Sequence, residues 1–168
     1  MSKTINNAAD LLKKYNIDSA PVDLNKILSK EGFTLSVVDL SEVEKQRGGE
    51  ISGLLIVDKE GKGIAVNKND SLERRRFTIA HELGHYYLHN TEVKNNNGNI
   101  SFYRQERNPS ETEANTFAAE LLMPEELVRM QHKKLMVPYL SDLATAFDVS
   151  KEAMHIRLKI LNLEYEDL

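Results

Sequence analysis

At its centre, the 168-residue sequence reads Phe77-Thr78-Ile79-Ala80-His81-Glu82-Leu83-Gly84-His85-Tyr86-Tyr87-Leu88-His89. In a helix, residues four apart lie one above the other, so His81 and His85 project from the same face. Two imidazoles placed in this way can bind one zinc ion, and Glu82 lies close enough to take a proton from a water molecule on the metal. The pattern therefore predicts half of a zinc site on a core helix. A third protein ligand has to come from elsewhere in the chain.

Composition describes an ordinary globular protein. Hydrophobic residues make up 40% and charged residues 29% of a chain long enough for one compact unit with its own core. We expect residues 1–168 to form a single domain, with 136–162 as a C-terminal helical subdomain. The sequence has neither an apolar run of membrane-spanning length nor a secretory signal. These features predict a cytoplasmic protein without membrane contact.

The absence of cysteine restricts the possible metal chemistry. A chain with zero cysteines forms no disulfide and no thiolate metal site, so a bound metal must use histidine and carboxylate ligands. The formal net charge of −4 argues against a nucleic-acid footprint over the whole surface, although it leaves room for a local basic patch.

The first half of the chain predicts a mixture of helices and strands. Helical spacing covers 4–15 and 22–31, and the second of these helices is expected to begin at Pro21 and end at Gly32. Short β-rich runs follow at 33–38, 51–57 and 63–67. The polar connection 58–62 predicts a hairpin, which would make the last two runs antiparallel neighbours. Residues 41–50 are polar and end in two glycines, which favours a surface loop over a substrate-contacting flap.

The second half of the chain predicts mainly helices. Helical patterns cover 71–89 and 108–122, and further helices are expected from Pro124, over 139–147 and over 150–161. Residues 90–107 show no periodicity, which predicts a long loop with a short ordered piece at 100–103. The overall prediction is an α+β fold, mainly helical, with a small three-stranded sheet.

Helical phase selects the third metal ligand. On the helix after Asn108, Glu111 falls at the edge of the apolar face, whereas Glu113 falls on the opposite, solvated side. Asn115 lies four residues after Glu111 and could hydrogen-bond a metal-binding histidine from behind. An alternative is that Glu111 only caps this helix, as the partner of Asn108. We favour the ligand, because the two histidines otherwise lack a third protein group.

Two motifs in this order resemble the ImmA/IrrE family of zinc metallopeptidases. They are Arg75-Arg76-Phe77-Thr78-Ile79-Ala80-His81-Glu82-Leu83-Gly84-His85 and Glu111-Thr112-Glu113-Ala114-Asn115-Thr116-Phe117-Ala118-Ala119-Glu120-Leu121-Leu122-Met123-Pro124. A looser resemblance extends over residues 21–161. It implies a zincin-like, gluzincin-like fold that binds one Zn²⁺ ion, with Glu111 as the third ligand. It also implies that the protein substrate is a helix-turn-helix repressor of mobile-element or stress genes.

Several other side chains are weaker candidates. His89 could extend the row of histidines, but a histidine packed at a helix end is the favoured interpretation. The arginine run 74–76 could meet an acidic substrate, although such runs are usually solvated. Four residues could stabilise an oxyanion, and the sequence does not choose among them: Tyr86, Tyr87, Tyr103 and His132.

The C-terminal stretch 143–158 resembles a helix-turn-helix, with its turn near 148–150. Its second helix offers basic side chains that could enter a DNA groove, namely Lys151, His155, Arg157 and Lys159. Related helices occur at this place in the metallopeptidase family, and the acidic tail 164–167 would repel phosphates. We therefore favour a structural or partner-docking role over direct DNA binding.

The sequence thus leads to three hypotheses. In the first, the protein is a zinc endopeptidase in which His81, His85 and Glu111 bind the metal and Glu82 activates water and then protonates the leaving amine. In the second, it is a non-catalytic module that binds a transcription regulator and uses zinc only to hold its fold. In the third, it binds DNA through its C-terminal helices.

Overall fold

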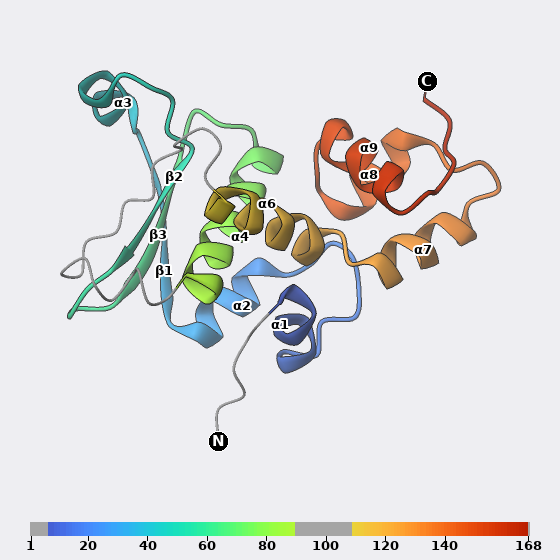
Figure 1. The fold of residues 1–168 in the computed structure, drawn as a ribbon, viewed down its shortest axis with the longest axis horizontal. Coiled ribbons are helices and arrows are strands. Elements are labelled where there is room, and N and C mark those ends of the chain that lie inside the picture. The colour runs from blue at the N-terminus through green and yellow to red at the C-terminus, as the bar shows by residue number, and fades with distance from the viewer. Residues whose placement is uncertain (1–6, 90–108, 168) are drawn as a thin grey trace.

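The computed structural model describes residues 7–89 and 109–167, which contain eight helices and one three-stranded sheet (Figure 1). The predicted α+β class with a small sheet is confirmed. Within these residues, no helix combines the length and the apolar character needed to cross a bilayer. The helices are α1 (Ala8–Lys14), α2 (Leu24–Glu31), α3 (Ser41–Arg47), α4 (Leu72–Leu88), α6 (Pro109–Leu122), α7 (Glu125–Lys134), α8 (Leu140–Phe147) and α9 (Lys151–Ile160), and the strands are β1 (Phe33–Val38), β2 (Gly53–Val57) and β3 (Lys62–Asn67).

The sheet has the order β1-β3-β2. β2 and β3 run antiparallel, with Leu55 opposite Ile64, so the predicted hairpin is confirmed. β1 lies parallel to β3 on its other side. Leu55 and Ile64 are both buried and belong to the hydrophobic core, and α4 packs against β2 and β3. The sheet thereby supports the helix that carries the two histidines.

One hydrophobic cluster extends through most of the described chain. It includes Leu11 of α1, Leu83 of α4, Phe117 of α6, Phe147 of α8 and Leu158 of α9. Figure 1 shows the sheet at one end and α7, α8 and α9 at the other, with α4 and α6 between them. The central pair of helices therefore joins the sheet to the C-terminal helices.

The prediction of a loop over 41–50 was wrong, because residues 41–47 form α3. Asp39 accepts hydrogen bonds from the backbone N–H and the hydroxyl of Ser41 at 3.0 and 2.6 Å, next to the start of the helix. Glu44 then accepts hydrogen bonds from the Ile51 backbone N–H and from the Asn67 amide, at 3.0 and 3.1 Å. These polar contacts fix α3 without a hydrophobic face, which explains why periodicity did not detect it.

Two helix starts also differ from the prediction. α2 begins at Leu24 and not at Pro21, because the Asp23 carboxylate caps it by accepting a hydrogen bond from the Lys26 N–H at 2.9 Å. α1 begins only at Ala8, after the cap residue Asn7. The loop predicted at 90–107, with its ordered piece at 100–103, lies outside the described residues.

The C-terminal helices follow the prediction closely. The predicted turn between α8 and α9 is confirmed: Asp148 ends α8 in the left-handed conformation, with φ 51°, and Ser150 caps α9 by accepting a hydrogen bond from the Ala153 N–H at 3.1 Å. The Arg157 guanidinium is buried and donates to the carbonyl of Met123, at the end of α6, at 2.9 Å. This contact fastens α9 to the centre of the molecule.

Candidate metal centre

Helix α4 brings the two histidines of the central motif together. The His81 and His85 rings lie one turn apart, with their centroids 4.6 Å from each other and their planes at 80°. Their Nε2 atoms are separated by only 3.0 Å. The two nitrogen atoms therefore point to one place beside the helix.

Helix α6 adds a carboxylate at the same place. Glu111 Oε2 lies 3.3 Å from His81 Nε2, and Glu111 Oε1 lies 3.1 Å from His85 Nε2. Each of the three residues offers one ligand atom, and these atoms all lie within 4.8 Å of one another. Glu111, at the edge of the apolar face in the predicted helix, does turn toward the histidines. The exposed Glu113 side chain does not join them.

Gly84 allows α6 to approach α4 this closely. A Cβ atom at position 84 would lie 3.0 Å from Ala114 Cα and 3.1 Å from the Ala114 carbonyl oxygen. Both distances are shorter than ordinary van der Waals contact. The missing side chain on α4 thus sets the distance across which Glu111 reaches the histidines.

Asn115 lies behind His81. Its Oδ1 atom is 2.9 Å from His81 Nδ1, and because an amide oxygen only accepts, Nδ1–H is the donor. The proton is then fixed on Nδ1, and Nε2 presents its lone pair toward His85 and Glu111. This is the contact that the helical phase of Asn115 predicts.

Glu82 is buried beside these three residues. Its exposure is 4%, and its Oε2 atom has no hydrogen-bond partner among the described residues. Burial raises the pKa of Glu82 to about 7, with the positive charge of His81 opposing the rise and the negative charge of Glu111 adding to it. A carboxyl group with a pKa near neutrality can both take up and release a proton.

Strand β2 packs against α4 next to Glu82, at Gly53, a residue to which the sequence alone assigns no role. A Cβ atom at position 53 would lie 2.3 Å from Thr78 Cγ2, 2.9 Å from the Ala65 carbonyl oxygen and 3.8 Å from Glu82 Oε1. The β2 backbone therefore lies directly against α4 at Glu82. A glycine inside a β-rich run was the only available signal of such a close approach.

The electrostatics of the three converging groups suit a cation. Burial lowers the pKa of His85 to about 4, and the nearby His81 contributes to the same effect. Burial also opposes the charged forms of His81 and Glu111, but their mutual interaction outweighs it, so the pKa of His81 is raised and that of Glu111 is lowered. Two imidazole nitrogens and one ionised carboxylate are a suitable donor set for Zn²⁺ and leave one position open.

The remaining candidates have other contacts. His89 caps the end of α4, where its Nε2 lies 3.5 Å from Glu113 Oε2, outside the group of three. Tyr86 accepts a hydrogen bond from Lys62 Nζ at 3.2 Å, and Tyr87 stacks on Phe117.

Of the last two oxyanion candidates, one contacts another part of the chain and the other lies outside the described residues. His132 Nε2 lies 2.6 Å from the backbone carbonyl oxygen of Glu164, near the C-terminus. Tyr103 falls in the range 90–108, which is not described. Within the arginine run, Arg74 contacts Ser52, and Arg75 and Arg76 donate to backbone carbonyls. None of these contacts reaches the three converging groups.

Sequence comparisons identify relatives of this chain. Residues 43–159 match the peptidase family described as the IrrE N-terminal-like domain. The chain is 32% identical over 151 residues to "Uncharacterized immunity region protein 2" of Bacillus phage phi105, covering 88% of this chain and 84% of that protein. It is also 32% identical over 80 residues to the metallopeptidase ImmA of Bacillus subtilis, covering 48% of this chain and 46% of ImmA.

A solved structure shares the fold. It is described as a Mycobacterium tuberculosis transcriptional regulator, and it superposes with a TM-score of 0.55 over 90% of this chain and 44% of that chain, at 17% identity. At this identity the likeness concerns the fold alone. The family match covers most of the chain and includes both motifs, so the chain belongs to the ImmA/IrrE family of metallopeptidases.

Proposed function

We propose that this protein is a zinc-dependent endopeptidase. The observation that carries the proposal is the convergence of His81 Nε2, His85 Nε2 and one Glu111 oxygen within 4.8 Å, beside a buried Glu82. These three residues would hold one Zn²⁺ ion, and Asn115 would keep His81 in the tautomer that binds it. The family membership and the name of the B. subtilis relative support the peptidase assignment.

The chain's own residues then divide the work of peptide hydrolysis. Zinc bound at this centre supplies a Lewis acid that polarises the peptide carbonyl and makes water more acidic. The Glu82 carboxylate accepts a proton as water attacks the carbonyl carbon, and it then delivers that proton to the departing amine. Glu82 is buried next to Gly53 of strand β2. This burial keeps the pKa of Glu82 near 7, where the carboxyl group can both accept and release the proton.

We further propose that the substrate is a helix-turn-helix repressor in the cytoplasm, which the enzyme inactivates by cleavage. The phage relative is named for an immunity region, and the resemblance to the ImmA/IrrE family implies a helix-turn-helix repressor as the substrate. Cleavage would relieve repression. If a small helix-turn-helix repressor is encoded beside this protein's gene, it is the first substrate to test.

The variant Glu82→Gln tests the mechanism. The amide cannot accept the proton, while the two histidines and Glu111 remain in place. We expect unchanged zinc stoichiometry by elemental analysis and a loss of repressor cleavage on the order of a thousandfold or more, measured by gel and mass spectrometry.

A matched control is Glu120→Gln on α6, because Glu120 is a half-buried carboxylate that is not among the three converging groups. Cleavage by Glu120→Gln should equal that of the wild type. Undiminished cleavage by Glu82→Gln would overturn the mechanism. Persistent derepression in cells without cleavage would instead favour the non-catalytic, regulator-binding hypothesis.

The C-terminal helices supply an observation against direct DNA binding. α9 exposes Ile156 and Ile160, with 51% and 63% of their surfaces accessible, where a DNA-reading helix presents polar side chains. Arg157, one of its basic candidates, is buried and bonded to the Met123 carbonyl. The absence of salt-dependent duplex binding at low ionic strength is therefore the expected result.

A further inference from the structure

A pocket lies away from the candidate metal centre. It has a volume of about 370 Å³, and its lining residues come from α2, the sheet, the start of α4 and the turn after α8. This volume lies in the range of small-molecule sites, about 300–1,000 Å³. None of the three converging metal-site residues lines it. Its apolar surface includes Leu24, Leu35, Val66 and Ile79.

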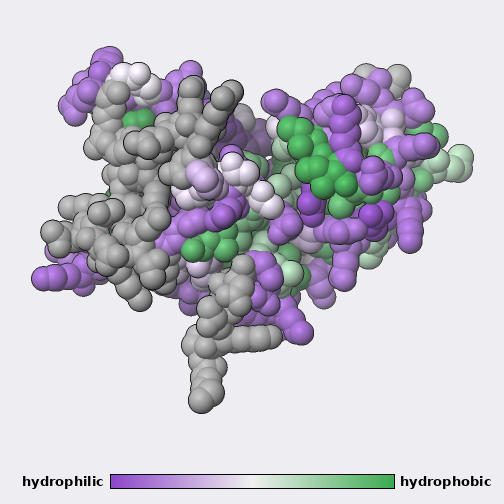
Figure 2. All heavy atoms as spheres, viewed as in Figure 1, coloured by the Kyte–Doolittle hydropathy of each residue, from purple (hydrophilic) through white to green (hydrophobic). Residues whose placement is uncertain are grey.

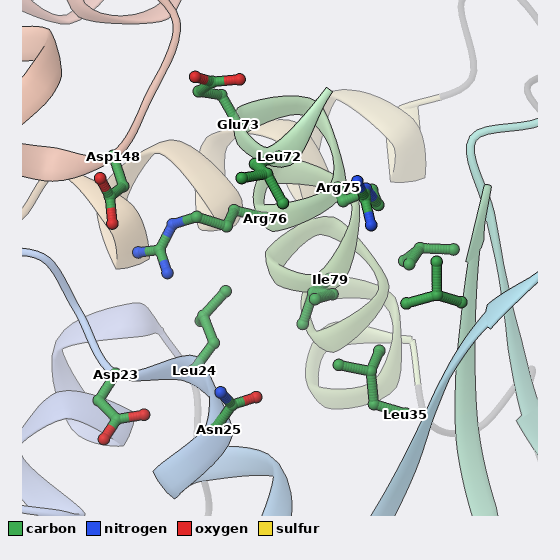
Figure 3. A pocket seen from close by; sticks show the side chains of 12 residues that line it. Asp23, Leu24, Asn25, Leu35, Leu72, Glu73, Arg75, Arg76, Ile79 and Asp148 are labelled. Atoms are coloured by element: carbon green, nitrogen blue, oxygen red, sulfur yellow. The ribbon is translucent and has the colours of Figure 1, made fainter. Parts of the chain in front are cut away.

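A guanidinium group enters this pocket. Figure 3 shows the Arg76 side chain extending from α4 toward the region between Asp148 and Asp23. One Arg76 Nη2–H group donates to the Val22 carbonyl oxygen at 2.9 Å, and Nε is buried without a hydrogen-bond partner in the described part of the chain. A guanidinium has five N–H groups in a planar fork that suits a carboxylate. Arg76 therefore retains donor capacity for a ligand.

Carboxylates surround this guanidinium without closing on it. Asp23 and Asp148 line the pocket on either side, and both residues are exposed. Among the described residues, neither forms an ion pair with Arg76 within 4.0 Å. One Asp23 carboxylate oxygen accepts the hydrogen bond from the Lys26 N–H that caps α2, and the other oxygen remains available for a ligand.

The charge balance of the lining selects the class of ligand. The lining contains three carboxylates, including Glu73, and two guanidiniums, Arg75 and Arg76, so its formal charge is −1. Arg75 already donates to the Asp70 carbonyl oxygen. A simple carboxylate would be repelled by the acidic side chains, and a simple ammonium by Arg76. A molecule that carries both a carboxylate and an ammonium group on an apolar body complements the guanidinium, the carboxylates and the apolar surface of the lining.

We propose that this pocket binds a free α-amino acid with an aliphatic side chain. Its carboxylate would pair with Arg76, its ammonium group with Asp148, and its side chain would pack on Leu24 and Ile79. This site is independent of peptide hydrolysis, and it places a small-molecule receptor on the same helix that carries His81 and His85.

The test is a titration of the full-length ¹⁵N-labelled chain with leucine, followed by amide NMR. We expect saturable shifts at Leu24, Ile79 and Asp148. Leucinamide lacks the carboxylate and N-acetyl-leucine lacks the ammonium, so each should bind at least about tenfold more weakly. The same probes separate a free amino acid from a protein terminus, because a chain end carries only one of the two charges.

Two variants test the assigned side chains. Arg76→Gln should weaken leucine binding at least about tenfold, whereas the neighbouring Arg74→Gln, which does not line the pocket, should leave it unchanged. Asp148→Asn should weaken leucine binding but not N-acetyl-leucine binding. Asparagine tolerates the φ of 51° at this position, so this variant remains informative if Arg76→Gln does not fold.

Three results would overturn the proposal. They are the absence of saturable shifts with leucine in the wild type, equal binding of leucine and N-acetyl-leucine, and unchanged leucine affinity in a folded Arg76→Gln variant.

Discussion

Glu111 and Glu113 lie two positions apart on α6 and have different surroundings. Glu111 contacts both imidazoles of the candidate metal centre, whereas the Glu113 side chain is 60% exposed and lies 3.5 Å from His89. Helical phase alone distinguished these two carboxylates. The sequence pattern is sufficient to tell them apart because the position of a residue on a helix determines the direction in which its side chain points.

Replacing the two carboxylates separately tests this distinction. Glu111→Gln removes an anionic ligand, so zinc affinity should fall at least about a hundredfold, measured by competition with a chromophoric chelator. Glu113→Gln should retain the wild-type affinity. Equal losses in the two variants would show that Glu111 acts only through the general charge of α6.

Other residues could not be assigned from the sequence. Gly53 lies next to Glu82, which is about 30 positions away along the chain. Arg76 donates to the Val22 carbonyl, more than 50 positions away, and lines the pocket between α2, the sheet and α4. No helical or strand periodicity around either position indicates such a contact. Tertiary packing, and not local pattern, determines what these two residues do.

The pair α4 and α6 is the element on which the centre depends. Gly84→Ala would place a methyl group 3.0 Å from Ala114 Cα, and α6 would have to move away. Overpacking of this kind costs about 1–3 kcal/mol, against a gain of about 1 kcal/mol from the helix propensity of alanine. We therefore expect a modest loss of stability together with weaker zinc binding, because Glu111 moves with α6.

Calorimetry and chelator competition measure the two effects of Gly84→Ala. Gly49→Ala is the matched control, since a Cβ atom there meets nothing within 4 Å. Unchanged zinc affinity in Gly84→Ala would contradict the role given to this close approach.

Helices α1 and α2 are joined by a half-buried acid, Glu31. Glu31 accepts hydrogen bonds from Lys14, at 2.6 Å, and from the Tyr15 hydroxyl. Burial alone would raise the pKa of Glu31, but these hydrogen bonds outweigh it, so the pKa lies below its usual value of 4.5. A lowered folded-state pKa adds stability that is present above pH 4.5 and is lost as the pH falls through the folded-state pKa.

The variant Glu31→Gln should therefore be less stable than the wild type at pH 7, by on the order of 1 kcal/mol. The difference in the free energy of unfolding should shrink as the pH falls below 4.5, as measured by urea denaturation at several pH values. Glu42→Gln should change little, because its ion pair with Lys45 is exposed. A difference that stays constant with pH would contradict the assignment.

The elements that periodicity predicted and those it missed differ in what stabilises them. α4, α6 and the β2–β3 hairpin each bury a hydrophobic face, which leaves a periodic signal in the sequence. α3 is held by the polar contacts of Asp39 and Glu44, and the parallel pairing of β1 with β3 depends on residues about 30 positions apart. Such contacts become visible only in three dimensions.

The whole chain, we propose, behaves as one domain with 136–162 as its helical subdomain. The hydrophobic cluster runs from α1 to α9. Arg157 of α9 donates to the Met123 carbonyl after α6, and Arg129 of α7 donates to the Leu161 carbonyl at the end of α9. Figure 2 shows hydrophobic residues at the surface of the part of the molecule that these helices form, and Ile156 and Ile160 of α9 are exposed.

Unfolding should therefore be a single transition. In urea, side-chain NMR signals of Leu83 in α4 and of Phe147 in α8 should disappear with the same midpoint. Earlier loss of the Phe147 signal would show that the C-terminal helices form a separate unit and would contradict the single-domain proposal.

The division of the metal-binding groups between α4 and α6 has a consequence for the protein's lifetime in the cell. An unfolded chain cannot hold the two imidazoles and the Glu111 carboxylate together, so zinc would bind the folded state alone. Each tenfold rise in free zinc above the dissociation constant then adds about 1.4 kcal/mol to the free energy of unfolding. Cellular proteases degrade the unfolded fraction, so zinc starvation would reduce the amount of this protein as well as its proposed activity.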